Sequence, residues 1–166
     1  MNEEKGSILI VDDDETCLEI NNVILTEAGY KTALAENGLD AWNLFKKEKY
    51  DLIVLDRMMP VMNGDELAQK IRATDQLIPI IMLTALSFQS EREEGIKLGV
   101  NQYISKANEN FDRELIAWCH NLIREYHKID RKISSEKTVT STTIKKLKKI
   151  TEQLNNLEIS DFNNGK

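Results

Sequence analysis

Short segments of strand length alternate along this chain with segments whose apolar residues recur at helical spacing. Three of the short segments, at residues 7–11, 51–56 and 79–83, are apolar runs rich in Ile, Leu and Val, as in buried strands, whereas residues 30–35 alternate only weakly. Such alternation favours an α/β fold, in which a parallel sheet carries helices on both faces. We expect strands at residues 7–11, 30–35, 51–56, 79–83 and 101–105, and helices at 15–29, 37–49, 65–73, 87–98 and around 115–126.

Four of the predicted strands lead into polar side chains. Asp12 and Asp13 follow the first strand, and Asp56 ends the third. Thr84 and Lys106 follow the fourth and the fifth. The carboxyl ends of parallel strands share one edge of the sheet, where open α/β sheets bind their ligands. We therefore expect three carboxylates, a hydroxyl and an ammonium to meet at this edge.

The acidic run at residues 12–15 indicates a cation site. Carboxylates this close repel one another, by on the order of 1 kcal/mol for each close pair at a surface-like dielectric. Asp14 and Glu15 are explained by a helix start, because the positive end of a helix favours acids. Asp12 and Asp13 precede that start. A divalent cation such as Mg²⁺ explains them, since it prefers clustered carboxylate oxygens.

Four sequence motifs contain these polar strand ends. They are Ile10-Val11-Asp12-Asp13, Leu55-Asp56 through Met59-Pro60 to Gly64, Leu83-Thr84-Ala85, and Tyr103-Ile104-Ser105-Lys106. In this order and spacing they resemble the receiver domain of bacterial two-component response regulators. The resemblance covers residues 7–127 and implies a flavodoxin-like fold with the strand order 2-1-3-4-5.

The resemblance also implies a role for each acid. Asp56 would be the phosphoacceptor, which takes a phosphoryl group from a cognate histidine kinase or phosphotransfer protein. Asp12 and Asp13 would hold Mg²⁺, together with the Asp56 carboxylate and the backbone carbonyl of Met58. The ion would offset the repulsion between an anionic nucleophile and an anionic phosphoryl group.

The remaining strand ends would complete a switch. Lys106 would pair with the phosphoryl oxygens, and the Thr84 hydroxyl would donate to one of them. After phosphorylation Thr84 would move inward and Tyr103 would rotate inward, which changes a protein–protein interaction face. For Tyr103 the alternative is an ordinary packed aromatic side chain. The chain would be a phosphoacceptor signalling domain rather than an enzyme, although it assists its own phosphotransfer and dephosphorylation.

One position departs from the family pattern. Receiver domains usually have proline after the lysine, often with a cis bond, whereas Ala107 follows Lys106 here. A cis bond before a non-proline residue costs about 2.5–4 kcal/mol. We therefore predict a trans Lys106–Ala107 peptide and a rearranged loop at residues 107–110, from which Lys106 reaches the site less squarely.

The C-terminal segment, residues 128–166, differs in charge from the rest of the chain. Residues 1–127 contain 13 Lys/Arg and 23 Asp/Glu, whereas residues 128–166 contain 9 and 5. The globular part therefore has a negative net charge and the tail a positive one, which indicates two parts of different character. We predict two domains, a receiver at residues 1–127 and a basic linker with an amphipathic helix at residues 128–166.

Two interpretations of this segment stay open. A heptad pattern from Cys119 has good apolar positions at both ends, but Ser134 to Thr143 is rich in weak helix formers. The last receiver helix either continues as a coiled coil that forms a homodimer, or a linker at 134–143 leads to a separate helix at 144–158. Alternatively the chain is a fragment cut before an output domain. Nucleic-acid binding by the lysines of this helix is the minority hypothesis.

Other features of the sequence argue against a membrane-spanning protein, a signal peptide and an aspartate-nucleophile phosphatase. No apolar run approaches the roughly 20 residues that span a bilayer, and the N-terminus lacks a signal-peptide pattern. We expect a cytoplasmic protein, with Cys17 and Cys119 as buried free thiols. An aspartate-nucleophile phosphatase would have a second Asp two residues after Asp56, where Met58 stands. A phosphorylation-independent receiver-like scaffold or dimerisation module is the alternative function.

Overall fold

The computed structural model describes residues 5–85, 98–135 and 148–149. The chain divides into two compact units, Met1–His127 and Lys128–Lys166. The predicted helix at residues 87–98, except for its last residue, lies outside the described residues, and so does the predicted helix at 144–158, except for residues 148–149.

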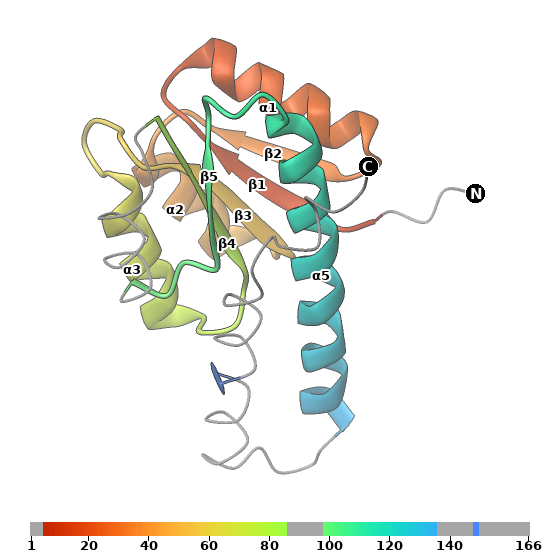
Figure 1. The fold of residues 1–166 in the computed structure, drawn as a ribbon. Helices are drawn as coiled ribbons and strands as arrows, with labels where there is room; N and C mark the ends of the chain where they lie inside the picture. Colours follow the sequence, from red (N-terminus) through yellow and green to blue (C-terminus); the bar gives the residue numbers. More distant parts are fainter. Residues whose placement is uncertain (1–4, 86–97, 136–147, 150–166) are drawn as a thin grey trace, which may run out of the picture. The chain divides into compact units, whose positions relative to one another are not determined.

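A five-stranded parallel sheet forms the centre of the first unit (Figure 1). The strand order is β2-β1-β3-β4-β5, which confirms the flavodoxin-like arrangement expected from the resemblance. The elements are β1 (Ser7–Val11), α1 (Glu15–Glu27), β2 (Lys31–Ala35), α2 (Gly38–Lys47), β3 (Leu52–Asp56), α3 (Gly64–Thr74), β4 (Ile80–Thr84), β5 (Gln102–Ser105) and α5 (Phe111–Ser135).

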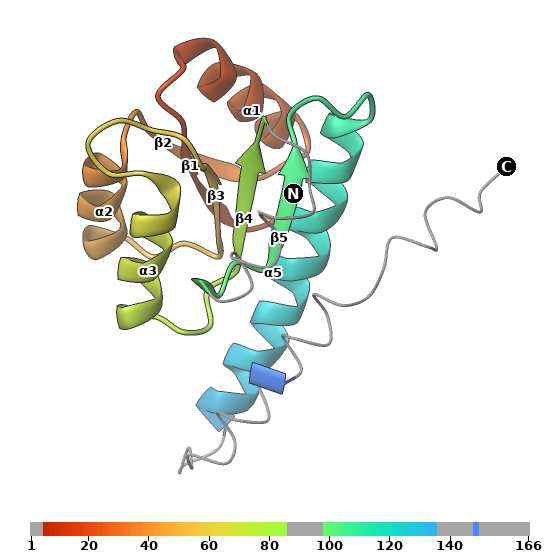
Figure 2. The same cartoon turned by 60° about the vertical axis from the view of Figure 1, so that its left-hand side comes forward.

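The sheet separates two apolar cores, as expected for a sheet buried on both faces. Helices α1 and α5 cover one face, and α2 and α3 cover the other (Figure 2). Residues of β1 alternate between the two cores: Ile8 and Ile10 pack toward α1 and α5, and Leu9 and Val11 toward the other side. Every residue of β3 and β4 is buried, which explains their uninterrupted apolar sequences.

Local hydrogen bonds explain where the helices begin. The Asp14 carboxylate accepts from the Cys17 N–H at 2.9 Å, and the Asn37 side chain accepts from the Asp40 N–H at 2.9 Å. Before α3, Asn63 and Glu66 form a reciprocal capping box. These caps satisfy backbone donors that a first helical turn leaves without partners. They fix the directions in which α1 and α3 leave the edge of the sheet.

Three details refine the sequence predictions. Cys119 is buried and unpaired as expected, but Cys17 is only half-buried, because it lies in the exposed first turn of α1. Helix α1 ends at Glu27 with Ala28 as its C-cap, and Gly29 follows with a φ of 92°. Helix α5 extends to Ser135, within the segment predicted to be a weak helix former. Among the described residues, no helix is both long enough and apolar enough to cross a membrane.

Candidate functional site

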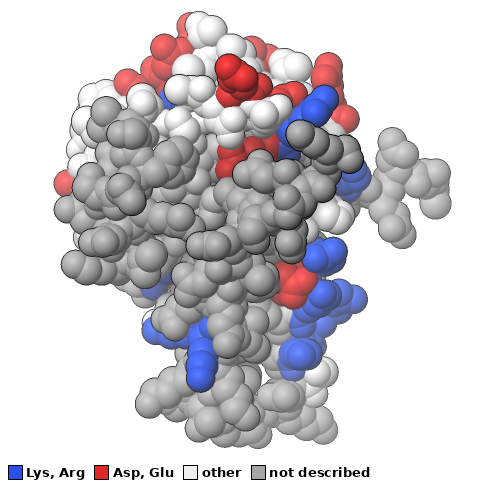
Figure 3. All heavy atoms as spheres, viewed as in Figure 1, with Lys and Arg blue, Asp and Glu red and all other residues white. Residues whose placement is uncertain are grey.

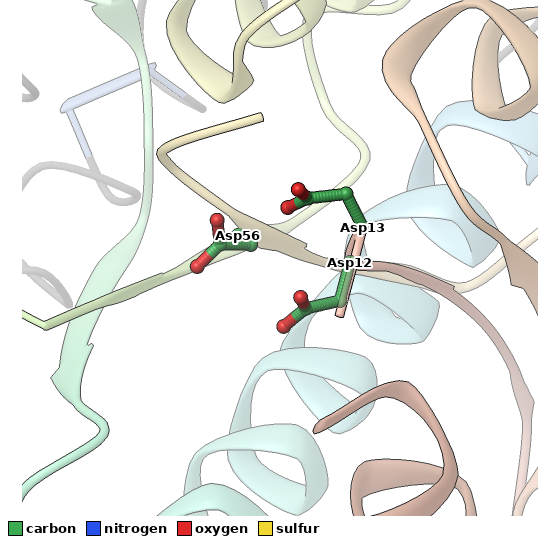
Figure 4. Close-up of side chains that lie close together, drawn as sticks. All are labelled: Asp12, Asp13 and Asp56. Carbon is green, nitrogen blue, oxygen red and sulfur yellow. The ribbon is translucent and has the colours of Figure 1, made fainter. Parts of the chain in front are cut away.

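Three carboxylates meet at the carboxyl edge of the sheet. Val11 of β1 pairs with Leu55 of β3, so that Asp12, which follows β1, lies next to Asp56, the last residue of β3. Asp12, Asp13 and Asp56 each place one carboxylate oxygen so that these oxygens all lie within 4.8 Å of one another. Figure 4 shows the three side chains side by side. We refer to these three residues as the acidic cluster.

The donor set of the acidic cluster fits a hard divalent cation. All three donors are carboxylate oxygens, the ligands that Mg²⁺ prefers in proteins. Asp12 and Asp56 are buried, with 1% and 7% exposure, while Asp13 is exposed. An ion at this place would thus have buried ligands on one side and access to water on the other, which suits Mg²⁺ because it retains several waters.

Lys106 is the cationic partner of the cluster. Its Nζ lies 2.7 Å from Asp12 Oδ2 and 2.7 Å from Asp56 Oδ1. The Lys106 N–H donates to the carbonyl of Thr84 at 2.8 Å, which holds the residue after β5 against the end of β4. The Lys106–Ala107 peptide is trans, as predicted. The expectation that Lys106 would reach the site less squarely was wrong, because its aliphatic chain spans the distance without a proline in the loop.

Burial and charge act in opposite directions on the two partners. Burial raises the pKa of Asp56, and although Lys106 lowers it, the neighbouring Asp12 adds to the increase, so the net direction is upward. For Lys106, burial lowers the pKa, but hydrogen bonds to Asp12 and Asp56 outweigh it and the pKa is raised. Lys106 is therefore a charged group at neutral pH. The ionised form of Asp56 is destabilised by burial and by its neighbouring acid.

The Asp56 carboxylate is held at both oxygens. Lys106 contacts Oδ1, and the Met58 N–H donates to Oδ2 at 2.9 Å. Met58 itself has a side chain that is 72% exposed, so only its main chain belongs to the site. The carboxylate orientation thus depends on the loop that follows β3 as well as on β5.

Thr84 and Tyr103 lie near this edge on β4 and β5. Asp56 pairs with Leu83, so Thr84 is the next residue along β4, and Thr84 pairs with Ser105. Both Thr84 and Tyr103 are buried, with 3% and 6% exposure. Tyr103 packs in the core between the sheet and α2 and α3. The structure thus places Thr84 at the same edge as the acidic cluster, and Tyr103 two residues before Ser105.

The loop at residues 57–63 contains contacts that the sequence reasoning missed. Arg57 donates from Nε and Nη2 to Asp65 Oδ2, at 3.3 and 3.1 Å. The Gly64 N–H donates to the Arg57 carbonyl at 2.9 Å. Two opposite charges eight residues apart, one in a loop and one at a helix start, usually face solvent, so their spacing gave no signal. The structure shows that they join the two ends of this loop.

Acidic and basic side chains are unevenly distributed on the face shown in Figure 3. Asp and Glu gather on its upper part, around the start of α1, while Lys and Arg lie mostly along α5 (Figure 3). Acidic side chains on this part of the surface attract cations, because a surface region of one charge sign raises the local concentration of counter-ions.

The fold and the cluster together define a class: an open α/β domain with an acidic cluster where its parallel strands end. Comparison with known families is more specific. Residues 8–117 match the model of the response regulator receiver domain, and the chain belongs to this family.

Relatives and solved structures agree with this assignment. The chain is 39% identical over 99 residues to the transcriptional regulatory protein CusR of Escherichia coli K12, which covers 60% of this chain and 44% of CusR. It is 37% identical over 129 residues to the probable transcriptional regulator ycf27 of Porphyra purpurea, and this match covers 78% of this chain and 52% of ycf27. The chain thus spans about half the length of these curated relatives.

Two solved receivers show the structural similarity. The receiver domain of the Francisella response regulator 1452 is 31% identical, with a TM-score of 0.68, and the match covers 72% of this chain and 98% of that one. The response regulator TrrA from Thermotoga maritima, solved in complex with Mg²⁺ and BeF, is 34% identical, with a TM-score of 0.64 and coverage of 70% and 97%.

Proposed function

We propose that this protein is the phosphoacceptor of a two-component phosphorelay, in which Asp56 takes a phosphoryl group from a histidine kinase or phosphotransfer protein. The observation that carries the proposal is the acidic cluster with Lys106 placed between Asp12 and Asp56. Phosphoryl transfer needs positioning and charge stabilisation more than covalent chemistry from the protein. A buried carboxylate beside a fixed ammonium and two further acids provides both.

Asp12, Asp13, the Asp56 carboxylate and the Met58 carbonyl would hold Mg²⁺. When bound, this ion supplies positive charge that allows an anionic phosphoryl donor to approach the acids. Lys106, already charged and fixed by its backbone hydrogen bond to Thr84, would stabilise the charge that develops on the transferred group. The Met58 N–H orients the nucleophile through Asp56 Oδ2.

The readout would use Thr84 and Tyr103. In the aspartyl-phosphate, new acceptor oxygens would draw the Thr84 hydroxyl inward. Tyr103, which packs on the same side of the sheet, would then change its packing and alter the interaction face formed by the last strands and helices. The protein is in this proposal a signalling domain rather than an enzyme. A kinase partner inside the cell implies a cytoplasmic location.

The domain division supports two further assignments. We propose that residues 1–127 form the receiver and residues 128–166 the basic segment that carries self-association, with α5 and the helix predicted at 144–158 as the dimer surface. The names of CusR and ycf27 describe transcriptional regulation by longer proteins. For this chain we propose signalling through protein partners.

Mass spectrometry tests the proposed function. Incubation of the full chain with acetyl phosphate and Mg²⁺ should add the mass of one phosphoryl group, and the Asp56→Asn variant should gain none. Chelation of the metal should also abolish the gain. An unmodified wild-type protein under these conditions would instead support the alternative of a phosphorylation-independent scaffold.

A further inference from the structure

An ion pair joins the two ends of the loop that follows the phosphoacceptor. Arg57 comes directly after Asp56, and Asp65 lies in the first turn of α3. Two guanidinium nitrogens donate to the same carboxylate oxygen, and the side chains are only 13% and 28% exposed. Within the described part of the chain, the other oxygen, Asp65 Oδ1, is buried without a hydrogen-bond partner. The charge of this carboxylate is therefore compensated through Oδ2 by Arg57.

The main chain of Arg57 is fixed as well. Its N–H donates to the carbonyl of Leu83 at 3.1 Å, and its carbonyl accepts from the Gly64 N–H at 2.9 Å. Leu83 is the residue before Thr84, and Gly64 is the first residue of α3. Arg57 thus connects β3, β4 and α3 through three separate groups. The next residue, Met58, directs its N–H to Asp56 Oδ2.

The rest of the loop is strained. Val61 has a φ of 69°, which is unusual for a β-branched residue. The Met62 N–H donates to the Pro60 carbonyl at 2.8 Å, which closes a γ-turn around Val61. Val61 is 85% exposed, so its side chain gains little from packing. Strained backbone of this kind persists only where the surrounding structure holds it. Here Met59 and Met62 pack against the core on either side of Val61, and the contacts of Arg57 fix the two ends of the loop.

We propose that Arg57 and Asp65 are positioning residues. Their ion pair keeps the loop closed, so that the Met58 main chain holds the Asp56 carboxylate in the orientation that binds Mg²⁺ and accepts the phosphoryl group. This inference rests on the proposed function, and it deepens it by naming two residues outside the acidic cluster. If the pair is broken, the turn at Val61 relaxes and the Met58 N–H moves away from Asp56 Oδ2.

For the Arg57 variant, electrostatics alone predicts a change in Mg²⁺ affinity opposite to the change that the positioning role predicts. Arg57 carries a positive charge close to the acidic cluster, so its removal alone should strengthen binding of a cation. The positioning role predicts weaker binding. For Asp65 both explanations predict weaker binding, so the Arg57 variant is the one that separates them.

The experiment measures the dissociation constant of Mg²⁺ by isothermal titration calorimetry on the full chain. We compare wild type with Arg57→Met, Arg57→Lys and Asp65→Asn. Arg57→Met and Asp65→Asn should weaken Mg²⁺ binding about tenfold or more, as is typical when groups that orient metal ligands are removed. Arg57→Lys should be intermediate, because one ammonium replaces a planar fork of donors. Phosphorylation by acetyl phosphate at saturating Mg²⁺ should slow in the same order.

Matched controls remove the same charges without touching the pair. Lys70→Met on α3 and Asp40→Asn on α2 should bind Mg²⁺ like wild type, since neither residue contacts the loop ends. Urea unfolding identifies variants that fail to fold. If Arg57→Met is unfolded, the comparison of Arg57→Lys with wild type decides the question.

The outcomes separate this inference from the proposed function. If wild type binds Mg²⁺ and gains a phosphoryl group, but folded Arg57→Met or Arg57→Lys binds Mg²⁺ as tightly as wild type or more tightly, the positioning role is wrong and the proposed function stands. If wild type itself neither binds Mg²⁺ nor gains a phosphoryl group, the proposed function is wrong and the positioning role falls with it.

Discussion

Asp56 is a residue whose charge is unfavourable to the fold in the absence of a cation. It is almost fully buried, and Asp12 stands beside it. A carboxyl group whose pKa is raised in the folded state makes the protein less stable at pH values where that group is ionised. In the proposed function, the phosphoacceptor is therefore a residue whose charge the fold alone does not favour, and perturbed pKa values of this kind cluster at functional sites.

Replacement of this residue should consequently stabilise the metal-free protein. The Asp56→Asn variant keeps the shape of the side chain and removes the unfavourable charge. At pH 7 without Mg²⁺, we expect the free energy of unfolding in urea to rise by roughly 0.5–2 kcal/mol. Addition of Mg²⁺ should raise the melting temperature of wild type clearly and that of the variant much less. A variant less stable than wild type without metal would contradict this account.

Gly64 shows how closely the backbone approaches the site. A Cβ at this position would lie 2.5 Å from the Asp56 carbonyl oxygen and 2.9 Å from Arg57 Cα. We expect Gly64→Ala to cost about 1–3 kcal/mol in urea unfolding, as overpacking does, and also to weaken Mg²⁺ binding. Gly29→Ala, which is strained by a φ of 92° but distant from the cluster, should cost stability and leave Mg²⁺ binding intact. Equal Mg²⁺ affinities in both variants would argue against a tight approach at Gly64.

At the scale of single residues, the sequence predicts some residues of the candidate site and not others. Asp12, Asp13, Asp56, Thr84 and Lys106 could be selected because strand ends place them at a common edge. Arg57 and Asp65 could not, because nothing in their spacing shows that their side chains turn toward each other. The reach of Lys106 was also misjudged, since a flexible side chain compensates for a change in the loop after it.

At the scale of elements, one carboxylate ties two strands to the last helix. Asp51, just before β3, accepts from the Ser7 N–H at 2.7 Å and the Ser7 hydroxyl at 3.1 Å. Its other oxygen lies 2.7 Å from His127 Nε2 on α5. Burial alone would raise the pKa of Asp51, but the hydrogen bonds from His127 and Ser7 outweigh it and lower the pKa. These contacts lie at the edge of the sheet opposite the acidic cluster.

Because the pKa of Asp51 is lowered, its contribution to the stability of the fold decreases at low pH. Its stabilisation is complete above the ordinary aspartate pKa of 3.8 and is lost as the pH falls through the lowered value. Asp51→Ala should therefore cost about 1–2 kcal/mol at pH 7, and the difference from wild type should shrink as the pH approaches 3. Urea unfolding across this pH range measures it. Glu36→Ala, which removes an exposed acid, should show no such trend; a pH-independent cost at Asp51 would contradict the assignment.

Elements were predicted better than their order. Apolar runs located β1, β3 and β4, because strands buried on both faces contain few polar residues. The strands β2 and β5 were located by weaker patterns, and β2 is partly exposed. Periodicity alone gave only the alternation, and the order came from the resemblance, because the chain order does not show that β1 lies between β2 and β3. Element ends shifted by a few residues where caps decide them, as at Asn63 and Ala28.

At the scale of the whole molecule, the described residues of the candidate site belong to the first unit. The acidic cluster, Lys106 and the Asp51 contacts all lie within Met1–His127. A protein that ends at His127 retains these residues and should gain a phosphoryl group from acetyl phosphate at a rate within about twofold of the full chain, if the two units act independently. Mass spectrometry over time compares the two. A truncated protein that folds but is not modified would show that residues 128–166 contribute to the site.

The same truncation tests self-association. If residues 128–166 carry a coiled coil, the full chain should be a dimer by analytical ultracentrifugation and the truncated chain a monomer. Phosphorylation of each form can be followed in the same experiment. A full chain that remains monomeric at every concentration would count against the dimer proposed above.

Lys106, which lies between two acids, reduces the net negative charge of the acidic cluster. The three carboxylates and one ammonium of the pocket leave two negative charges, which a single divalent cation would cancel. A phosphoryl donor would then approach a locally neutral surface rather than a repulsive one. Salt in the medium should thus affect the approach of the donor far less than it affects the capture of the metal, because screening acts on uncompensated charge.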